Sequence, residues 1–167
     1  MMMNLDDILS FGAFLGICLG AASSGAIFKP DLWYASLKKP FWCPPDWLFP
    51  VAWSVLYPTI ALAGWLVWRI AGFAGAETAL ILFGAHLVLN FTWSIIFFGL
   101  KRMDWAFYGI VLFWLTLIAT IFLFYEINQI AAYLLLPYLA WATFAGALNY
   151  IVWQMNKAAL SKLLQEH

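Results

Sequence analysis

Five long runs without any charged side chain divide the chain. The first four occupy residues 8–28, 47–68, 78–100 and 105–125, with 21, 22, 23 and 21 residues. The last run, 127–156, has 30 residues, but Asn128 and Gln129 fit the preceding turn, so its apolar part is placed at 130–155. An α-helix rises 1.5 Å per residue and needs about 20 residues to cross the hydrocarbon core of a bilayer. The pattern therefore predicts five transmembrane helices.

The pattern also predicts how these spans are folded together. None of the runs alternates between apolar and polar residues, as the roughly 10-residue strands of a membrane β-barrel would. A helix satisfies its backbone polar groups within its own segment, which the bilayer requires. The expected fold is an all-α membrane protein, a five-transmembrane-helix bundle in which residues 1–167 form a single domain.

Composition and charge exclude several classes of protein. The chain is 66% hydrophobic and only 10% charged, too few polar groups to cover the surface of a soluble domain. Eight basic residues balance eight acidic ones, so no net charge attracts nucleic acid. Cys18 and Cys43 form neither a CxxC pair nor a disulfide framework. An integral membrane protein is the class that remains.

The basic residues gather on one side of the predicted membrane. That side holds Lys29, Lys38, Lys39, Lys101, Arg102, Lys157 and Lys162. The other side has only Arg69. Cytoplasmic loops carry an excess of Lys and Arg. We therefore expect the C-terminus and the loop 29–46 to be cytoplasmic, in a bacterial cell membrane.

The loop 29–46, with the four residues after it, differs from the other connections. It holds five of the seven prolines and three tryptophans: Pro30, Pro40, Pro44, Pro45, Pro50, Trp33, Trp42 and Trp47. Proline fixes φ and removes a donor, so we expect an ordered, non-helical segment whose aromatic rings form a lid capping one end of the bundle. An interfacial aromatic belt is the alternative, but a belt would occur at both membrane surfaces.

Polar side chains within the spans predict a pocket. On the third span His86, Asn90, Trp93 and Phe97 follow at helical spacing and share one face. Polar groups at this depth must face protein or a cavity, so this face points inward. Trp141, Ala145, Leu148 and Asn149 form a similar stripe on the fifth span. We expect an apolar pocket between the two faces, with Asn90 lining it and Asn149 bonding a neighbouring helix.

Four tracts together resemble the signature of one known family. The string W-Y-x-x-L-x-K-P-x-W-x-P-P-x-W-x-F-P spans residues 33–50, and Trp53–Tyr57 begin the second span. LNFTWSIIFFG occupies 89–99, and PYLAWATFAGALNYIVW occupies 137–153. These tracts resemble the TspO/MBR family, which comprises the tryptophan-rich sensory proteins of bacteria and the mitochondrial translocator protein, once called the peripheral benzodiazepine receptor.

The resemblance implies a five-helix membrane protein that is usually a homodimer. Such proteins bind tetrapyrroles such as protoporphyrin, and also sterols and synthetic isoquinoline or benzodiazepine ligands. No cofactor or metal is required, and a porphyrin is the expected ligand. The resemblance places the cavity between the spans beneath the loop. Matched residue by residue, it implies ligand contacts from Tyr34, Trp53, Tyr57, Asn90, Trp93, Trp105, Trp141, Ala145 and Leu148.

Three further features leave alternatives open. His86 could ligate haem, but many family members have glutamine at this position, which favours a hydrogen-bonding role. The cholesterol-recognition pattern of vertebrate members fails here, because six residues separate Tyr150 from Lys157. A ridge of small residues on the first span fits either dimerisation or packing within the bundle. It consists of Gly12, Gly16, Gly20 and Ser24.

The function classes can now be ranked. A membrane receptor or sensor for porphyrins is the prediction. A porphyrin-degrading enzyme driven by light and oxygen is an alternative, although no triad, paired carboxylate or nucleotide loop occurs in the sequence. A transporter of tetrapyrroles or sterols is another, although no charge lies in the middle of a span.

Overall fold

The computed structural model describes residues 4–158, and helices account for most of them. In chain order the elements are α1 (Leu5–Ile27), α2 (Leu32–Ser36), α3 (Leu48–Gly75), α4 (Glu77–Ser94), the π-helical turn η1 (Ile95–Gly99), α5 (Met103–Ile127), α6 (Gln129–Leu134) and α7 (Leu136–Met155). Five stretches of the described chain are long and apolar enough to cross a membrane, α4 with η1 forming one and α6 with α7 another. The prediction of an all-α five-helix bundle is confirmed.

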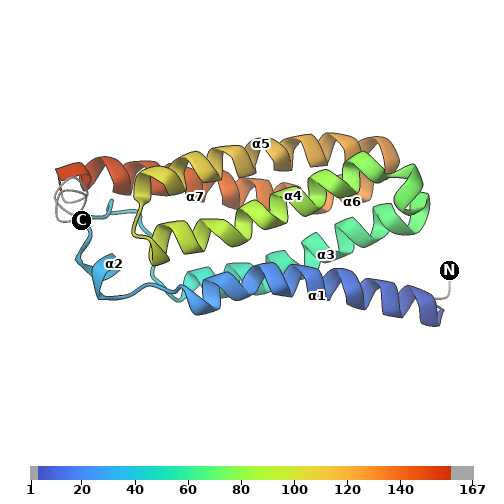
Figure 1. Cartoon of the computed structure of the whole chain (residues 1–167), viewed down its shortest axis with the longest axis horizontal. Helices are drawn as coiled ribbons and strands as arrows, with labels where there is room; N and C mark the ends of the chain where they lie inside the picture. The colour runs from blue at the N-terminus through green and yellow to red at the C-terminus, as the bar shows by residue number, and fades with distance from the viewer. Residues whose placement is uncertain (1–3, 159–167) are drawn as a thin grey trace.

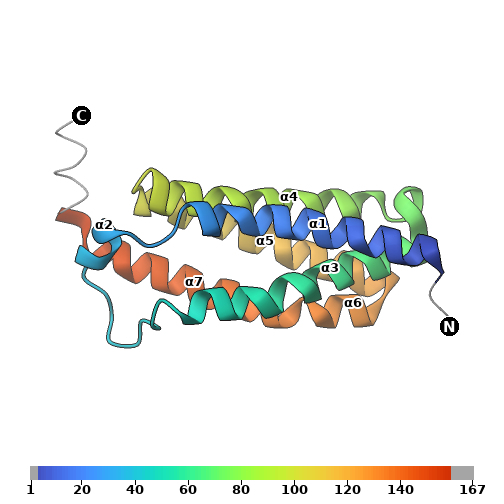
Figure 2. The same ribbon diagram turned by 90° about the horizontal axis from the view of Figure 1, so that it is seen from below.

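The five spans run side by side along the long axis of the molecule, with the start of α1 and the end of α7 at opposite ends (Figures 1 and 2). They form a ring, in which α1 packs on α3 and α4, α5 on α4, α6 and α7, and α3 on α6. Large apolar side chains such as Leu9, Leu112 and Phe122 are exposed on the outside. This outer surface suits hydrocarbon, and the chain is an integral multi-pass membrane protein.

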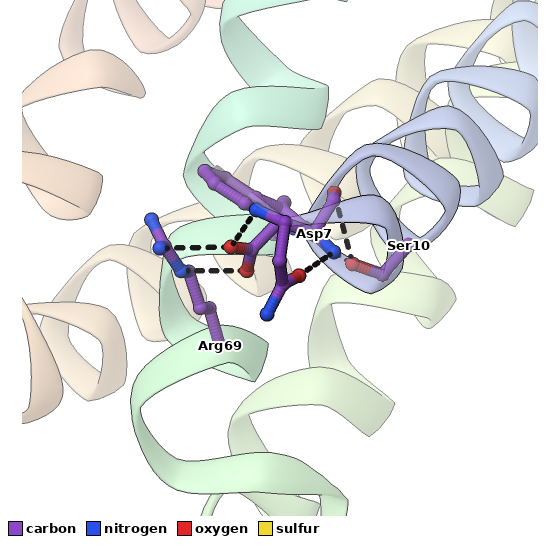
Figure 3. Close-up of polar contacts among 5 residues, drawn as sticks. Asp7, Ser10 and Arg69 are labelled. Atoms are coloured by element: carbon purple, nitrogen blue, oxygen red, sulfur yellow. Dashed lines mark hydrogen bonds and ion pairs between the residues drawn. The ribbon is translucent and has the colours of Figure 1, made fainter. Parts of the chain in front are cut away.

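Polar contacts fasten α1 to α3 at the end of the bundle opposite the loop (Figure 3). The Asp7 carboxylate accepts hydrogen bonds from Arg69 Nε at 2.9 Å and Arg69 Nη2 at 3.1 Å. The same carboxylate accepts from the backbone N–H of Asn4, which caps α1. One turn further, Trp65 Nε1 donates to Ser10 Oγ at 3.0 Å. Arg69, the one basic residue expected on this side, is thus paired with an acid.

Two spans are interrupted, one at a glycine with a positive φ and one just before a proline. Gly72 has φ 64° and ψ −177°, a conformation that residues with a Cβ rarely adopt, and it breaks the end of α3. The predicted second span ended at residue 68, a turn before this break. In the last span, α6 and α7 meet at Leu135, two residues before Pro137. Pro137 has no N–H with which to extend the hydrogen-bond ladder.

The lid, residues 29–46, lies at the other end of the bundle, where Figures 1 and 2 show α2 at the same end as the last turns of α1 and α7. The prediction that this segment is non-helical is corrected for Leu32–Ser36, which form α2. These residues lie between Pro30 and Pro40 and are free of proline. Asp31 caps the helix by accepting from the backbone N–H of Tyr34 at 3.0 Å. The rest of the lid consists of turns and extended chain.

The four small residues of the ridge on α1 differ in their exposure. Gly12, Gly16 and Gly20 are exposed, and a Cβ added at any of them would meet no atom within 4 Å. Ser24 is buried, and its hydroxyl donates to the carbonyl of Ala21. Close packing within the bundle therefore does not explain the three glycines, which face outward from the chain.

Candidate functional site

A cavity of about 740 Å³ lies beneath the lid, within the range of about 300–1,000 Å³ that is usual for small-molecule sites. Its walls come from the last turns of α1, the first turns of α3, the end of α4, η1, α7 and the lid. Most lining residues are aromatic or small and apolar. Such walls accommodate a rigid, flat, hydrophobic molecule.

Two stacked aromatic pairs form parts of the wall. On α3, the rings of Trp53 and Tyr57 stack at 4.9 Å with an interplanar angle of 26°. On α4 and η1, the rings of Trp93 and Phe97 stack at 5.1 Å and 24°. Both pairs join residues four apart in sequence, so the α-helical repeat of α3 and α4 places each pair on one face.

The π-helical turn η1 adds a second phenylalanine. The N–H of Leu100 bonds the carbonyl of Ile95, five residues back, which widens this turn relative to an α-helix. Phe97 and Phe98 both line the cavity, with ring centroids 4.9 Å apart. Both rings also meet the ring of Tyr34 edge-on, at 6.1 and 5.4 Å. The wide turn thus turns two consecutive side chains toward the lid.

Several polar groups of the cavity are hydrogen-bonded to one another or to the backbone. Tyr57 donates its hydroxyl to Asn90 Oδ1 at 2.8 Å, which joins α3 to α4. Trp93 Nε1 donates to Asn149 Oδ1 at 3.1 Å, and Asn149 Nδ2 donates to the carbonyl of Met103 at 2.9 Å. Asn149 therefore bridges α4, α5 and α7, as the packing interpretation of this residue predicts. These bonds hold the aromatic walls in fixed orientations.

Tyr34 closes the cavity from the lid side. It is buried, and burial raises the pKa of its phenol, so the group stays neutral at physiological pH. Its hydroxyl lies 3.9 Å from Cys43 Sγ, and Lys39 Nζ lies 4.2 Å from the centre of its ring. The N–H of Tyr34 holds the pKa of the Asp31 carboxyl below its usual value, with Lys101 contributing less.

An amide clamp fastens the lid to the end of α7. Asn156 Oδ1 accepts from the backbone N–H of Lys38 at 3.0 Å, and Asn156 Nδ2 donates to the carbonyl of Lys38 at 2.9 Å. Asn156 Nδ2 also donates to the carbonyl of Val152. The two bonds with Lys38 resemble the paired hydrogen bonds of a β-ladder, with a side-chain amide in place of a second strand. They fix the lid between α2 and Pro40.

Of the nine residues that the resemblance implied, seven line the cavity: Tyr34, Trp53, Tyr57, Asn90, Trp93, Ala145 and Leu148. Trp141 lies behind the wall, where its ring meets those of Trp53 at 6.5 Å and Phe49 at 5.8 Å. Trp105 is 63% exposed and does not line the cavity, so the structure does not bring it together with the other predicted residues. The next residue, Ala106, is fully buried, so helical geometry turns Trp105 toward the outside.

Several residues that line the cavity were not among the predicted ligand contacts. They are Phe49 and Pro50 at the start of α3, Phe98 on η1, Val152 on α7, and Leu19, Ala22, Gly25 and Phe28 on or just after α1. Small residues at the end of α1 carry no chemical signal of their own. Phe98 does not share the helical face that carries Asn90, Trp93 and Phe97, and only the π-helical turn brings it to the cavity.

His86 lies deeper in the bundle than the cavity and does not line it. Its ring is fully buried and meets the rings of Phe83 and Tyr138 at 5.2 and 5.8 Å. Neither ring nitrogen has a hydrogen-bond partner among residues 4–158, and the same holds for the hydroxyl of Tyr138. His86 is thus not among the residues that a ligand in the cavity would contact, and its hydrogen-bonding role stays a prediction.

Comparison with known proteins gives matches along most of the chain. The sequence model of the TspO/MBR family matches residues 13–154. A tryptophan-rich sensory protein of Cereibacter sphaeroides is 42% identical over 154 residues, covering 92% of this chain and 95% of that protein. The translocator protein of Sus scrofa is 38% identical over 150 residues, covering 89% and 85%. The translocator protein of Homo sapiens is 41% identical over 126 residues, covering 74% and 75%.

Proposed function

The chain belongs to the TspO/MBR family, and we propose that it is a membrane receptor that binds a flat hydrophobic ligand of the porphyrin class in the cavity beneath the lid. The observation that carries this proposal is the wall of the cavity. Two stacked aromatic pairs line a space of about 740 Å³, and the amides of Asn90 and Asn149 beside them are already hydrogen-bonded to protein. A planar macrocycle would gain offset or edge-on ring contacts on several sides.

The first experiment is a titration of the detergent-solubilised protein with protoporphyrin, followed by the shift of its Soret absorbance. We expect saturable binding that Trp53→Ala weakens by about tenfold, because that substitution removes a ring from the wall and opens its stacked partner. Absorbance avoids the loss of signal that removing a tryptophan would cause in a fluorescence assay.

Trp105→Ala is the matched control, since it removes the same side chain from a position outside the cavity. Its affinity should equal that of the unmodified protein. Partitioning of the porphyrin without saturation, unchanged in Trp53→Ala, would overturn the proposed site. A loss of binding in Trp105→Ala as well as in Trp53→Ala would favour the residue set implied by the resemblance over the one the structure brings together.

We propose further that the lid end is cytoplasmic in a bacterial cell membrane. The loops and helix ends on that side carry Lys29, Lys38, Lys39, Lys101, Arg102 and Lys157, and Lys162 of the same group lies outside the described residues. Arg69 at the far end is neutralised by Asp7. The excess of basic residues on the lid side supports this orientation.

A homodimer is the assembly we propose, as the resemblance implies. Its support in this chain is the outward face of α1, where Gly12, Gly16 and Gly20 leave room for another helix to approach closely. Chemical cross-linking in native membranes would test it, and a chain that remains monomeric at all cross-linker concentrations would contradict it.

A further inference from the structure

Two charged side chains stand at the rim of the cavity. Of its lining residues, only Lys29 and Asp46 carry a charge. Lys29 follows the end of α1 and Asp46 precedes α3, so the two come from different sides of the lid. Lys29 also borders a shallow hollow on the outside, together with Asp31, Leu32 and neighbouring residues. Lys29 thus borders both the cavity and the outer surface at the lid end of the bundle.

Neither of these charges is neutralised by an ion pair among residues 4–158. Other charged residues at the lid end do form ion pairs. Lys101 Nζ lies 3.5 Å from Asp31, and Arg102 lies 2.6 Å from Asp104. Among the residues that line the cavity, Lys29 and Asp46 are therefore the two charges that no ion pair neutralises in the described part of the chain.

The rest of the wall restricts where a ligand could carry a charge. Below the rim the lining consists of apolar, aromatic and neutral polar side chains. An ionised group placed there, at the depth of the spans, would lose its hydration without gaining a counter-ion. An anionic substituent must therefore remain at the rim, where Lys29 attracts it and Asp46 repels it.

We infer that the cavity selects amphiphilic ligands that carry carboxylate groups, with Lys29 binding the carboxylate end and Asp46 directing that end toward Lys29. This inference rests on the proposed function and specifies its ligand. A neutral ester of the same ring system would keep the aromatic contacts and lose the contact with Lys29. Lys29 and Asp46 at the rim thus select ligands by charge, whereas the aromatic walls below the rim select them by shape.

The test compares protoporphyrin with its dimethyl ester in nanodiscs of phosphatidylcholine, a lipid without net charge. Lys29→Gln should weaken binding of the diacid about threefold, and Asp46→Asn should strengthen it about twofold, because each removes one charge near the carboxylates. Both effects should shrink as salt is raised. The affinity for the ester should be the same in all variants.

Lys157→Gln is the matched control, because Lys157 lies at the same end of the bundle beside Trp153 and does not line the cavity. It should leave both affinities unchanged. An unmodified protein that binds diacid and ester equally, or a Lys29→Gln variant that weakens both equally, would overturn the inference and leave the proposed function standing. If neither compound binds saturably, the proposed function itself fails.

Discussion

The phenol of Tyr57 connects the wall of the cavity to the packing of the bundle. Its ring stacks on Trp53, its hydroxyl donates to Asn90 Oδ1, and the side chain is almost fully buried. One residue thus positions a tryptophan that lines the cavity and satisfies an amide oxygen at bilayer depth. Removing the hydroxyl leaves that oxygen without its donor, in surroundings where water is scarce.

Tyr57→Phe is expected to lower the free energy of unfolding by about 1 kcal/mol, since interhelical hydrogen bonds in membranes contribute about 0.6 kcal/mol and an unsatisfied acceptor adds to the loss. Thermal or SDS unfolding of the purified protein would measure it. Tyr150→Phe serves as the control, because Tyr150 is 45% exposed and its ring packs on the outside of α7 against Phe107. Equal stability of the two variants would contradict the role given to the hydroxyl.

At this scale the sequence predicted which side chains turn inward but not what each one touches. Asn90 and Asn149 could be placed inside because a polar group within a span must avoid lipid. Trp105 could not be placed, because a tryptophan near a span end suits a cavity, a core and the membrane interface equally well. Its exposure depends on the rotation of α5, which the burial of Met103 and Ala106 fixes.

The lid is an element held by a few specific contacts and not by a long interface. Its α2 helix has only five residues, fewer than an isolated helix needs to be stable. Tyr34 and Leu37 are buried against Phe97, Leu148 and neighbouring residues. The Asn156 clamp then fixes the chain directly after α2. Packing holds one side of the lid and the clamp holds the other.

Asn156→Ala should therefore loosen the lid while leaving the five spans folded. Hydrogen exchange of the amides of residues 38–47 is expected to accelerate about tenfold, because the N–H of Lys38 loses its acceptor and its carbonyl loses a donor. Ligand dissociation should accelerate as well. Gln154→Ala, which removes a half-buried amide from the same helix end, should change neither rate. Unaltered exchange in Asn156→Ala would show that packing alone holds the lid.

The charge-free runs predict that the long helices form. They do not predict where a helix is broken or widened. The break at Gly72 needs a backbone angle that the sequence allows but does not require. The π-helical turn η1 is not visible in hydrophobic periodicity, so Phe98 could not be assigned to the cavity. The clamp joins Lys38 and Asn156, residues 118 apart, and no local pattern indicates such a contact.

The whole molecule has two chemically different ends. The lid end bears most of the basic residues, and the far end bears Asp6, Asp7, Glu77 and Glu126 with Arg69 as its single base. Fully exposed Phe41 marks the lid, and exposed Gln129 marks the far end. These two positions can report the orientation of the chain in a membrane.

Phe41→Cys and Gln129→Cys, each combined with Cys43→Ser, should react differently with a membrane-impermeant maleimide. Cys18 stays in place because it is fully buried. In intact spheroplasts we expect labelling of Gln129→Cys only, and of both variants after lysis, because positively charged loops remain in the cytoplasm. Labelling of Phe41→Cys in intact spheroplasts would reverse the proposed orientation.

The Asp7–Arg69 pair has a consequence for how the protein is made. It joins the first span to the second, so it can form while the later spans are still being synthesised. The cavity, in contrast, takes a wall from α7 and its lid clamp from Asn156, near the end of the chain. A nascent chain can therefore form its first hairpin early, whereas the cavity beneath the lid is complete only after α7 and Asn156 have been synthesised.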